Sequence, residues 1–261
     1  MPWTRRHAMG LGLSALALAG LLQAPAAWAQ SKTAPVHIAV ASVLGDNFAV
    51  VTRQVNTGSL LDANLRDNFK LSDGVFDTPA LLAMEGAIKQ AAPAAQYSLM
   101  KLSQSEALSG AAALLDGASF AAPAGLKAVF EQIHATHFLM LSAFRAPAVV
   151  IDAQGVGVGN GWLEGVGYYI DRHAKVRRHE EGGERIGYIA PFTYFKLSLF
   201  DLASGKQLAS KVVNRAPMRA DFDKGLADPW EMLTMKEKLD MLTAQLKTEI
   251  EKAVPEVLPQ R

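Results

Sequence analysis

Short apolar runs alternate with helix-like stripes along the chain, and together they predict an α/β domain built on a sheet. Runs rich in β-branched and apolar residues, which favour strands, occupy residues 36–44, 48–55, 97–102, 136–144, 165–171, 192–202 and 206–213. Turn residues follow the first run as Gly45-Asp46-Asn47 and separate the last two as Ala203-Ser204-Gly205. We therefore expect two hairpins, one formed by the first two runs and one by the last two.

Helical periodicity appears between these runs. Asp77-Thr78-Pro79 combines a cap with a proline suited to a first turn, and the stretch that follows predicts a helix over 77–92, stopped by Pro93. Shorter helices are predicted over 105–115 and 123–135, and the second leads directly into an apolar strand. A helix that feeds a buried strand is typical of a βαβ unit.

A long amphipathic helix is predicted near the C-terminus. Thr234 and Glu237 have the spacing of a capping box, and Pro255 marks the expected end. One apolar stripe runs along this segment and consists of Leu239, Leu242, Leu246, Ile250 and Val254. Because strands both alternate with helices and pair in hairpins, we expect an α/β (α+β) fold in which helices pack on a mixed sheet.

The first 29 residues have the pattern of a cleaved export signal. Arg5 and Arg6 precede an apolar stretch over 9–22, and Ala27-Trp28-Ala29 matches the small-x-small pattern of a cleavage site. We expect a periplasmic or secreted protein that begins near Gln30 after processing. The paired arginines also match part of a twin-arginine signal, so the general and the twin-arginine export routes both stay open.

Composition narrows the classes of function. The chain has no cysteine, which excludes disulfides, thiol catalysis, thiolate metal ligands and a lipid-bearing cysteine. Its 26 basic and 25 acidic residues give a formal net charge of +1, so no strong field favours nucleic acid. The apolar stretch of the signal is too short to span a membrane. We expect a single domain over 30–261, with no transmembrane segment and no lipid anchor.

Glycine and charge concentrate in one stretch, which we interpret as a Gly-rich and charged hairpin insertion at about 154–187. Its glycines lack the spacing of a nucleotide-binding loop, and Gly182-Gly183 favours an exposed turn. Residues suited to an anionic ligand or a charged partner surface gather here, namely Asp171, Arg172, His173, Arg177 and Arg178. The alternative is a solvated hairpin tip that mixed charge keeps soluble.

The turn after the first strand is a second candidate site. Gly45-Asp46-Asn47 resembles the Gly-Asp-Ser block of the SGNH esterases, but Asn47 stands where the serine nucleophile belongs, and an amide cannot attack a carbonyl. Asp46 and Asn47 are therefore candidate binding residues, or a turn that bonds its own backbone. An alternative function is a small hydrolase or cofactor-binding enzyme in which Asp46, Asp171 and His173 share one cleft, with His173 as base.

Three further residues have a spacing that metal sites use. The spacing Glu131-x-x-His134-x-x-His137 would place a carboxylate and an imidazole on neighbouring turns of a helix. A di-iron bundle needs this motif twice, however, and His137 falls where the helix gives way to a strand. The alternative is a histidine at a helix end together with a partly buried His137. We predict no cofactor and no metal.

Three stretches give the chain a layout similar to that of several exported α/β domains. They are the opening strand over 36–43, the helix-to-strand passage over 130–141 and the hairpin over 197–208. The layout resembles the curli secretion lipoprotein, the outer-membrane lipoprotein activators of penicillin-binding proteins and the N-terminal domain of TolB. This resemblance implies a role through protein contacts in the cell envelope, although the lipid-bearing cysteine is missing and no functional residue carries over.

The sequence therefore favours a non-catalytic periplasmic binding or assembly module. Its expected partner is another envelope protein, with the charged stretch as the contact. The alternative remains the enzyme described above.

Overall fold

Nine strands form one mixed sheet in the computed structural model, which describes residues 36–55, 63–72, 74–102, 119–177, 184–220 and 228–259. The strands of this sheet are β1 (His37–Val43), β2 (Asn47–Thr52), β3 (Leu65–Lys70), β4 (Gln96–Met100), β5 (His137–Ala143), β6 (Arg145–Pro147), β9 (Trp162–Arg177), β10 (Glu184–Asp201) and β11 (Gln207–Arg215). A separate two-stranded sheet consists of β7 (Val150–Ile151) and β8 (Gly157–Val158). The helices among the described residues are α1 (Asp77–Ala91), α3 (Ala124–Gln132), α4 (Met235–Val257) and the short 3-10 helix η1 (Pro229–Met232).

These elements confirm the predicted α/β class, with a mixed sheet, helices packed on it and a long C-terminal helix. The β10–β11 hairpin is confirmed as well. The export signal predicted over 1–29 and the helix predicted over 105–115 lie outside the described residues.

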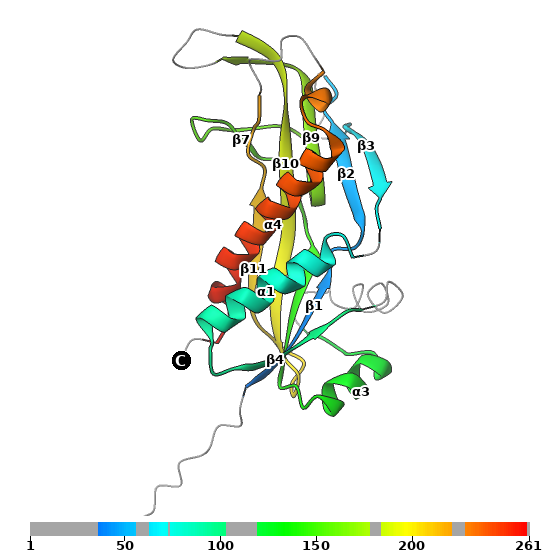
Figure 1. Cartoon of the computed structure of the whole chain (residues 1–261), viewed down its shortest axis with the longest axis vertical. Coiled ribbons are helices and arrows are strands. Elements are labelled where there is room, and N and C mark those ends of the chain that lie inside the picture. The colour runs from blue at the N-terminus through cyan, green and yellow to red at the C-terminus, as the bar shows by residue number, and fades with distance from the viewer. Residues whose placement is uncertain are drawn as a thin grey trace, which may run out of the picture. The chain divides into compact units, whose positions relative to one another are not determined.

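The long strand β10 joins two groups of strands (Figure 1). Its first part pairs antiparallel with β9, from Glu184 opposite Arg177 to Tyr194 opposite Gly165. Its second part pairs antiparallel with β5 and with β11. The sheet continues from β5 to β1 and β4, and from β9 to β2 and β3. One 18-residue strand therefore holds both groups together.

The predicted hairpin between the first two strands is wrong. β1 pairs in parallel with β4 and β5, whereas β2 pairs in parallel with β9. Because β5 and β9 both run antiparallel to β10, β1 and β2 run in the same direction, and no reversal occurs between them. Gly45, with φ of +82°, makes a bend there instead of a hairpin turn.

Asp77 holds this bend from the start of α1. Its Oδ1 accepts a hydrogen bond from Ser42 Oγ at 2.5 Å, from the Leu44 amide at 3.0 Å and from the Gly45 amide at 3.4 Å. The predicted cap is therefore corrected: the N-cap position is Phe76, and the Asp77 carboxylate is directed to the bend. The Asp77 side chain therefore makes a tertiary contact with the bend, whereas the local sequence pattern predicts that it caps the helix.

Helices α1 and α4 cover one face of the sheet. Their buried side chains share a core with β1, β2, β5, β9 and β10, to which α4 contributes Leu242, Leu246, Ile250 and Val254. The capping box of Thr234 and Glu237 is present, as predicted. α4 extends two residues past Pro255, and its C-cap amide, at Leu258, still bonds the Val254 carbonyl at 3.2 Å.

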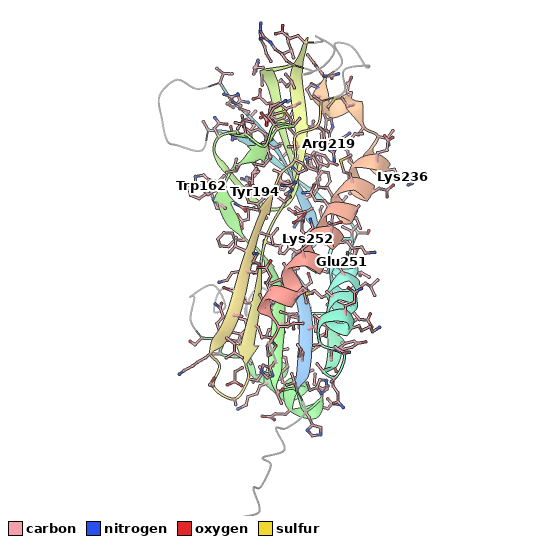
Figure 2. All side chains as sticks on the ribbon, turned by 90° about the vertical axis from the view of Figure 1, so that its left-hand side faces the viewer. Trp162, Tyr194, Arg219, Lys236, Glu251 and Lys252 are labelled. Carbon is pink, nitrogen blue, oxygen red and sulfur yellow. The ribbon has the colours of Figure 1, made fainter. Side chains whose placement is uncertain are left out.

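The opposite face is covered in two different ways. Over the strands near β5, α3 packs Leu126 and Phe130 against an aromatic cluster that includes Phe120, Phe138 and Phe200. Over β2, β9 and β10, a second cluster contains no helical residue. Its members come from the sheet, from the chain around β6 to β8 and from Ala216. Trp162 is the first residue of β9 and stands directly before Leu163, a member of this cluster. Figure 2 shows α4 on one side of the sheet and Trp162 on the other.

The stretch at about 154–187 is part of the sheet and is not an addition to it. It contributes all of β9, which lies between β2 and β10, and the beginning of β10. Gly167 allows the close approach of β2, because a Cβ at this position would lie 2.0 Å from the Ala49 carbonyl oxygen. The glycines that suggest a loop therefore also serve strand packing.

Candidate functional site

A cavity of about 840 Å³ opens beside the helix-free cluster. We call it the basic cavity. It is lined by Arg53, the β7–β8 connection, the distal half of β9, Tyr188 and residues 218–220. A volume of this size lies within the usual range for ligand sites, roughly 300–1,000 Å³.

An ion pair between Arg53 and Asp171 forms the floor of the cavity. Arg53 Nη1 lies 2.5 Å from Asp171 Oδ2, and the Asp171 side chain is fully buried. This hydrogen bond raises the pKa of Arg53 despite the opposing effect of burial. Arg53 directly follows β2, and its amide bonds the Ile170 carbonyl at 2.8 Å, so the pair ties β2 to β9.

Asp171 also stabilises a bulge in β9. Asp171 pairs with Tyr188 and Lys175 with Ile186, so three residues of β9 lie opposite the single residue Gly187. The amides of His173 and Ala174 inside the bulge each donate to Asp171 Oδ1 at 2.9 Å. A short acceptor side chain at the start of the bulge satisfies both amides at once.

Two basic side chains give the cavity its charge. Arg177 at the end of β9 and Arg219 beside β10 are both exposed. The two described carboxylates that line the cavity are engaged: Asp171 pairs with Arg53, and Asp152 Oδ1 accepts the amides of Gln154 and Val156 at 2.9 and 2.8 Å. Within the described ranges, neither Arg177 nor Arg219 has a carboxylate partner.

Lys175 adds a third cation, but Glu184 lies 3.3 Å from its Nζ. The Tyr188 side chain is buried, and this burial raises the pKa of its hydroxyl, so the phenol stays neutral. The cavity thus combines a neutral, buried tyrosine, the Arg53–Asp171 ion pair and two arginines that have no carboxylate partner among the described residues.

The wall of the cavity is apolar. Five side chains of this wall are half-buried and pack against the helix-free cluster, namely Val158, Ala174, Val176, Met218 and Ala220. Apolar walls with a few placed charges are typical of binding sites.

The residues predicted as one charged contact surface therefore have different roles in the structure. Asp171, predicted as a contact residue, is corrected to a buried structural group. Arg172 Nε bonds Asp228 Oδ2 at 2.7 Å and does not line the cavity. Burial opposes ionisation of Asp228, but the bonds from Arg172 and the Trp230 amide lower its pKa overall. His173 is exposed, Arg177 lines the cavity, and Arg178 lies outside the described residues.

Asp46 and Asn47, the candidate residues of the turn after β1, lie away from the basic cavity. Asp46 is buried, with its Oδ2 at 3.9 Å from Lys70 Nζ. Asn47 is exposed and lines a separate groove of about 410 Å³, together with Arg66, Arg145 and Glu164. Neither residue lines the basic cavity.

The cleft required by the enzyme alternative is not formed. Thr52 pairs with Ile170, so Asp171 lies level with Arg53, seven residues along from Asp46. At about 3.3 Å a residue, this separates the two aspartates by roughly 20 Å. Asp171 Oδ1 bonds the backbone amide of His173, and no bond to its imidazole is present among the described contacts.

The candidate metal residues do not form a site. Glu131 and His134 are exposed at the end of α3, where His134 adopts a left-handed φ of 53°. His137 belongs to β5, with its Nδ1 at 2.8 Å from Thr136 Oγ1, and partial burial lowers its pKa. Among the residues that the structure describes, no three His, Cys, Asp or Glu side chains gather as a metal ion requires.

Sequence reasoning missed Arg53, Met218 and Arg219 in this site. Arg53 stands directly after the apolar run of β2, and this is the only signal that it gives. Met218 and Arg219 lie in an irregular segment that meets β10 through one bridge between Arg219 and Ile189. No local pattern indicates that contact.

Comparisons with known proteins identify no family. No protein-family model and no curated protein matches the chain. Among solved structures, the chain is similar to a homolog of the neuraminyllactose-binding hemagglutinin from Helicobacter pylori, with 8% identity, a TM-score of 0.33 and coverage of 85% of this chain and 83% of that one. It is also similar to a DUF330 protein from Xanthomonas campestris, with 8% identity, a TM-score of 0.29 and coverage of 84% and 87%.

These TM-scores are too low to support an argument about fold or function. Neither structure belongs to the exported families that the layout resembles, so that resemblance stays an expectation. Across the described residues, no helix has the length and apolar character needed to cross a membrane. The basic cavity is the best-defined candidate site among the described residues.

Proposed function

We propose that this chain is a non-catalytic binding module of the periplasm, and that the basic cavity binds an acidic segment of another envelope protein. The charge of the cavity carries the proposal. Arg177 and Arg219 have no carboxylate partner among the described residues, while Asp152 and Asp171 are engaged within the chain. Carboxylates from a partner would complete both guanidinium groups with charge-assisted hydrogen bonds.

The location rests on the expected export signal, and the kind of partner on the layout resemblance to envelope domains. The enzyme alternative has lost its support, because a base and the carboxylate that orients it must lie within hydrogen-bond reach. Asp46 lies at the opposite end of β2 from Asp171, and Asp171 is occupied by Arg53 and two amides.

Binding of a defined acidic peptide tests the proposal. The probe is a fluorescently labelled peptide of alternating glutamate and serine, and fluorescence anisotropy gives its Kd. The protein should bind this peptide, and Arg177→Gln combined with Arg219→Gln should weaken binding by roughly tenfold or more, because two charged hydrogen-bonding groups are removed. Affinity should also fall as salt is added.

A matched control removes two positive charges that lie outside the basic cavity. Lys236 and Lys252, both labelled in Figure 2, lie on α4 and do not line the basic cavity. Lys236→Gln combined with Lys252→Gln gives the same change in net charge and should leave binding unchanged. Equal binding by both double variants, or no binding by the unaltered protein, would contradict the proposed function.

A further inference from the structure

The helix-free cluster is the one apolar cluster of the described residues that contains no helical residue. The other two clusters include residues of α1 and α4, or of α3. Here the wall of the basic cavity is formed by half-buried Val158, Val176 and Met218, with Ala174 and Ala220 beside them. Apolar surface that stays accessible between charged groups is a common feature of interaction sites.

The two arginines that line the basic cavity lie at different levels along β10. In the backbone register, Arg177 lies opposite Glu184, whose carboxylate contacts Lys175. Arg219 lies opposite Ile189, five residues further along β10. At about 3.3 Å a residue, their backbone positions are roughly 17 Å apart along the strand direction. One small anion would not span this separation, whereas an extended peptide covers it with about five residues.

We propose that the partner segment carries a large apolar side chain that enters the basic cavity, flanked by carboxylates that meet Arg177 and Arg219. This rests on the proposed function and specifies its recognition element. Charge complementarity places the carboxylates of the segment, and the apolar side chain packs on the cavity wall that Val176, Met218 and their neighbours form. Buried apolar anchors of this kind commonly supply most of the affinity of an interface.

Peptides that differ at one position test the anchor. The first probe is a seven-residue peptide with blocked ends, glutamate at its second and sixth positions, leucine at its fourth and serine elsewhere. The second probe has serine in place of the leucine. The leucine peptide should bind roughly tenfold or more tightly, since burying a leucine contributes about 1.5–3 kcal/mol.

Salt separates the two contributions. Replacing both glutamates by glutamine should remove most of the salt dependence of Kd, whereas replacing the leucine should leave the salt dependence unchanged. Equal affinity of the leucine and serine peptides would overturn the anchor and leave the proposed function intact. Failure of every acidic peptide to bind at any salt concentration would overturn both, as would binding to vesicles of anionic lipid without binding to any peptide.

A variant of the wall gives a second, independent test. Met218→Gln keeps the length of the side chain and adds an amide at a half-buried position, so folding should be preserved. Met218→Gln should weaken binding of the leucine peptide several-fold and leave the Kd of the serine peptide unchanged. The control is Met235→Gln at the start of α4, where the methionine is 45% exposed and does not line the cavity. Equal loss with both probes would assign Met218 a structural role and overturn the anchor.

Discussion

Arg53 Nη1 lies 2.5 Å from Asp171 Oδ2, although 118 residues separate these partners in the chain. The aspartate side chain is fully buried and the arginine side chain is 36% exposed. Asp171 also receives two amides of the β9 bulge. One carboxylate therefore fixes the floor of the basic cavity and the shape of the strand that bears Arg177.

Asp171→Ala should strongly destabilise the protein. It leaves Arg53 and two amides without their acceptor, and breaking a buried pair costs about 3 kcal/mol or more. Asp171→Asn retains an acceptor for the amides, so its free energy of unfolding should lie between those of Asp171→Ala and the natural protein. Urea unfolding followed by circular dichroism measures both. A change below about 0.5 kcal/mol for Asp171→Ala would contradict this structural role.

Gly167→Ala should be among the most damaging single-methyl additions in the protein. The new Cβ would lie 2.0 Å from the Ala49 carbonyl oxygen and 2.7 Å from Phe192 Cζ, so β2 must move away from β9. We expect a loss of about 3 kcal/mol or more, or failure to fold.

Gly86→Ala is the matched control for this substitution. Gly86 lies inside α1, and a Cβ there meets nothing within 4 Å. Replacing a helical glycine by alanine should stabilise the protein by about 0.5–1 kcal/mol. Thermal melts of the two variants should therefore shift in opposite directions. Equal shifts would contradict the close approach of β2 and β9.

Asp77 should make stability depend on acidity. Its burial raises its pKa, an effect only partly offset by the hydrogen bonds from Ser42 and the bend amides. A carboxyl with a raised pKa in the folded state contributes stability that is fully present below its unfolded pKa, about 3.9, and is lost as pH rises through the folded pKa. The stability of the natural protein relative to Asp77→Asn should therefore fall as pH rises above about 4.

Unfolding free energies of both proteins at several pH values between 4 and 7 measure this difference. A constant difference across this range would contradict the raised pKa. Asp77→Ala removes all three accepted hydrogen bonds at the bend and should cost about 2 kcal/mol or more at any pH in the range.

Thr234→Ala should remove the capping box at the start of α4. Thr234 Oγ1 accepts the Glu237 amide at 3.3 Å, and Glu237 Oε2 accepts the Thr234 amide at 2.7 Å. Loss of such a cap costs about 1 kcal/mol. Thr248→Ala, at an exposed position of the same helix, is the control. Its free energy of unfolding should be within about 0.5 kcal/mol of that of the natural protein. Equal effects would show that the cap contributes nothing.

Much of the element content was predictable because its signals are local. The α1 and α4 periodicities, the apolar run of β5 and the turn between β10 and β11 each depend on neighbouring residues. The pairing of β1 and β2 was not predictable in this way. A glycine-containing turn between two apolar runs suits a hairpin or a bend, and distant strands β5 and β9 decide between them.

The candidate site was only partly predictable for the same reason. Charge density pointed to Arg177 and its neighbours, but the same pattern made Asp171 look exposed. Its burial depends on Arg53 and on the bulge opposite Gly187. Met218 and Arg219 line the cavity because an isolated β-bridge between Arg219 and Ile189 holds their segment beside β10.

The sequence by itself determined the α/β class, the long amphipathic α4 with its cap and the absence of cysteine chemistry. It also determined the expectation of export. The tertiary structure decided which charges are buried, which are accessible and which apolar side chains stay uncovered. Periodicity and capping act over a few residues, whereas burial and charge pairing depend on segments that only the folded sheet brings together.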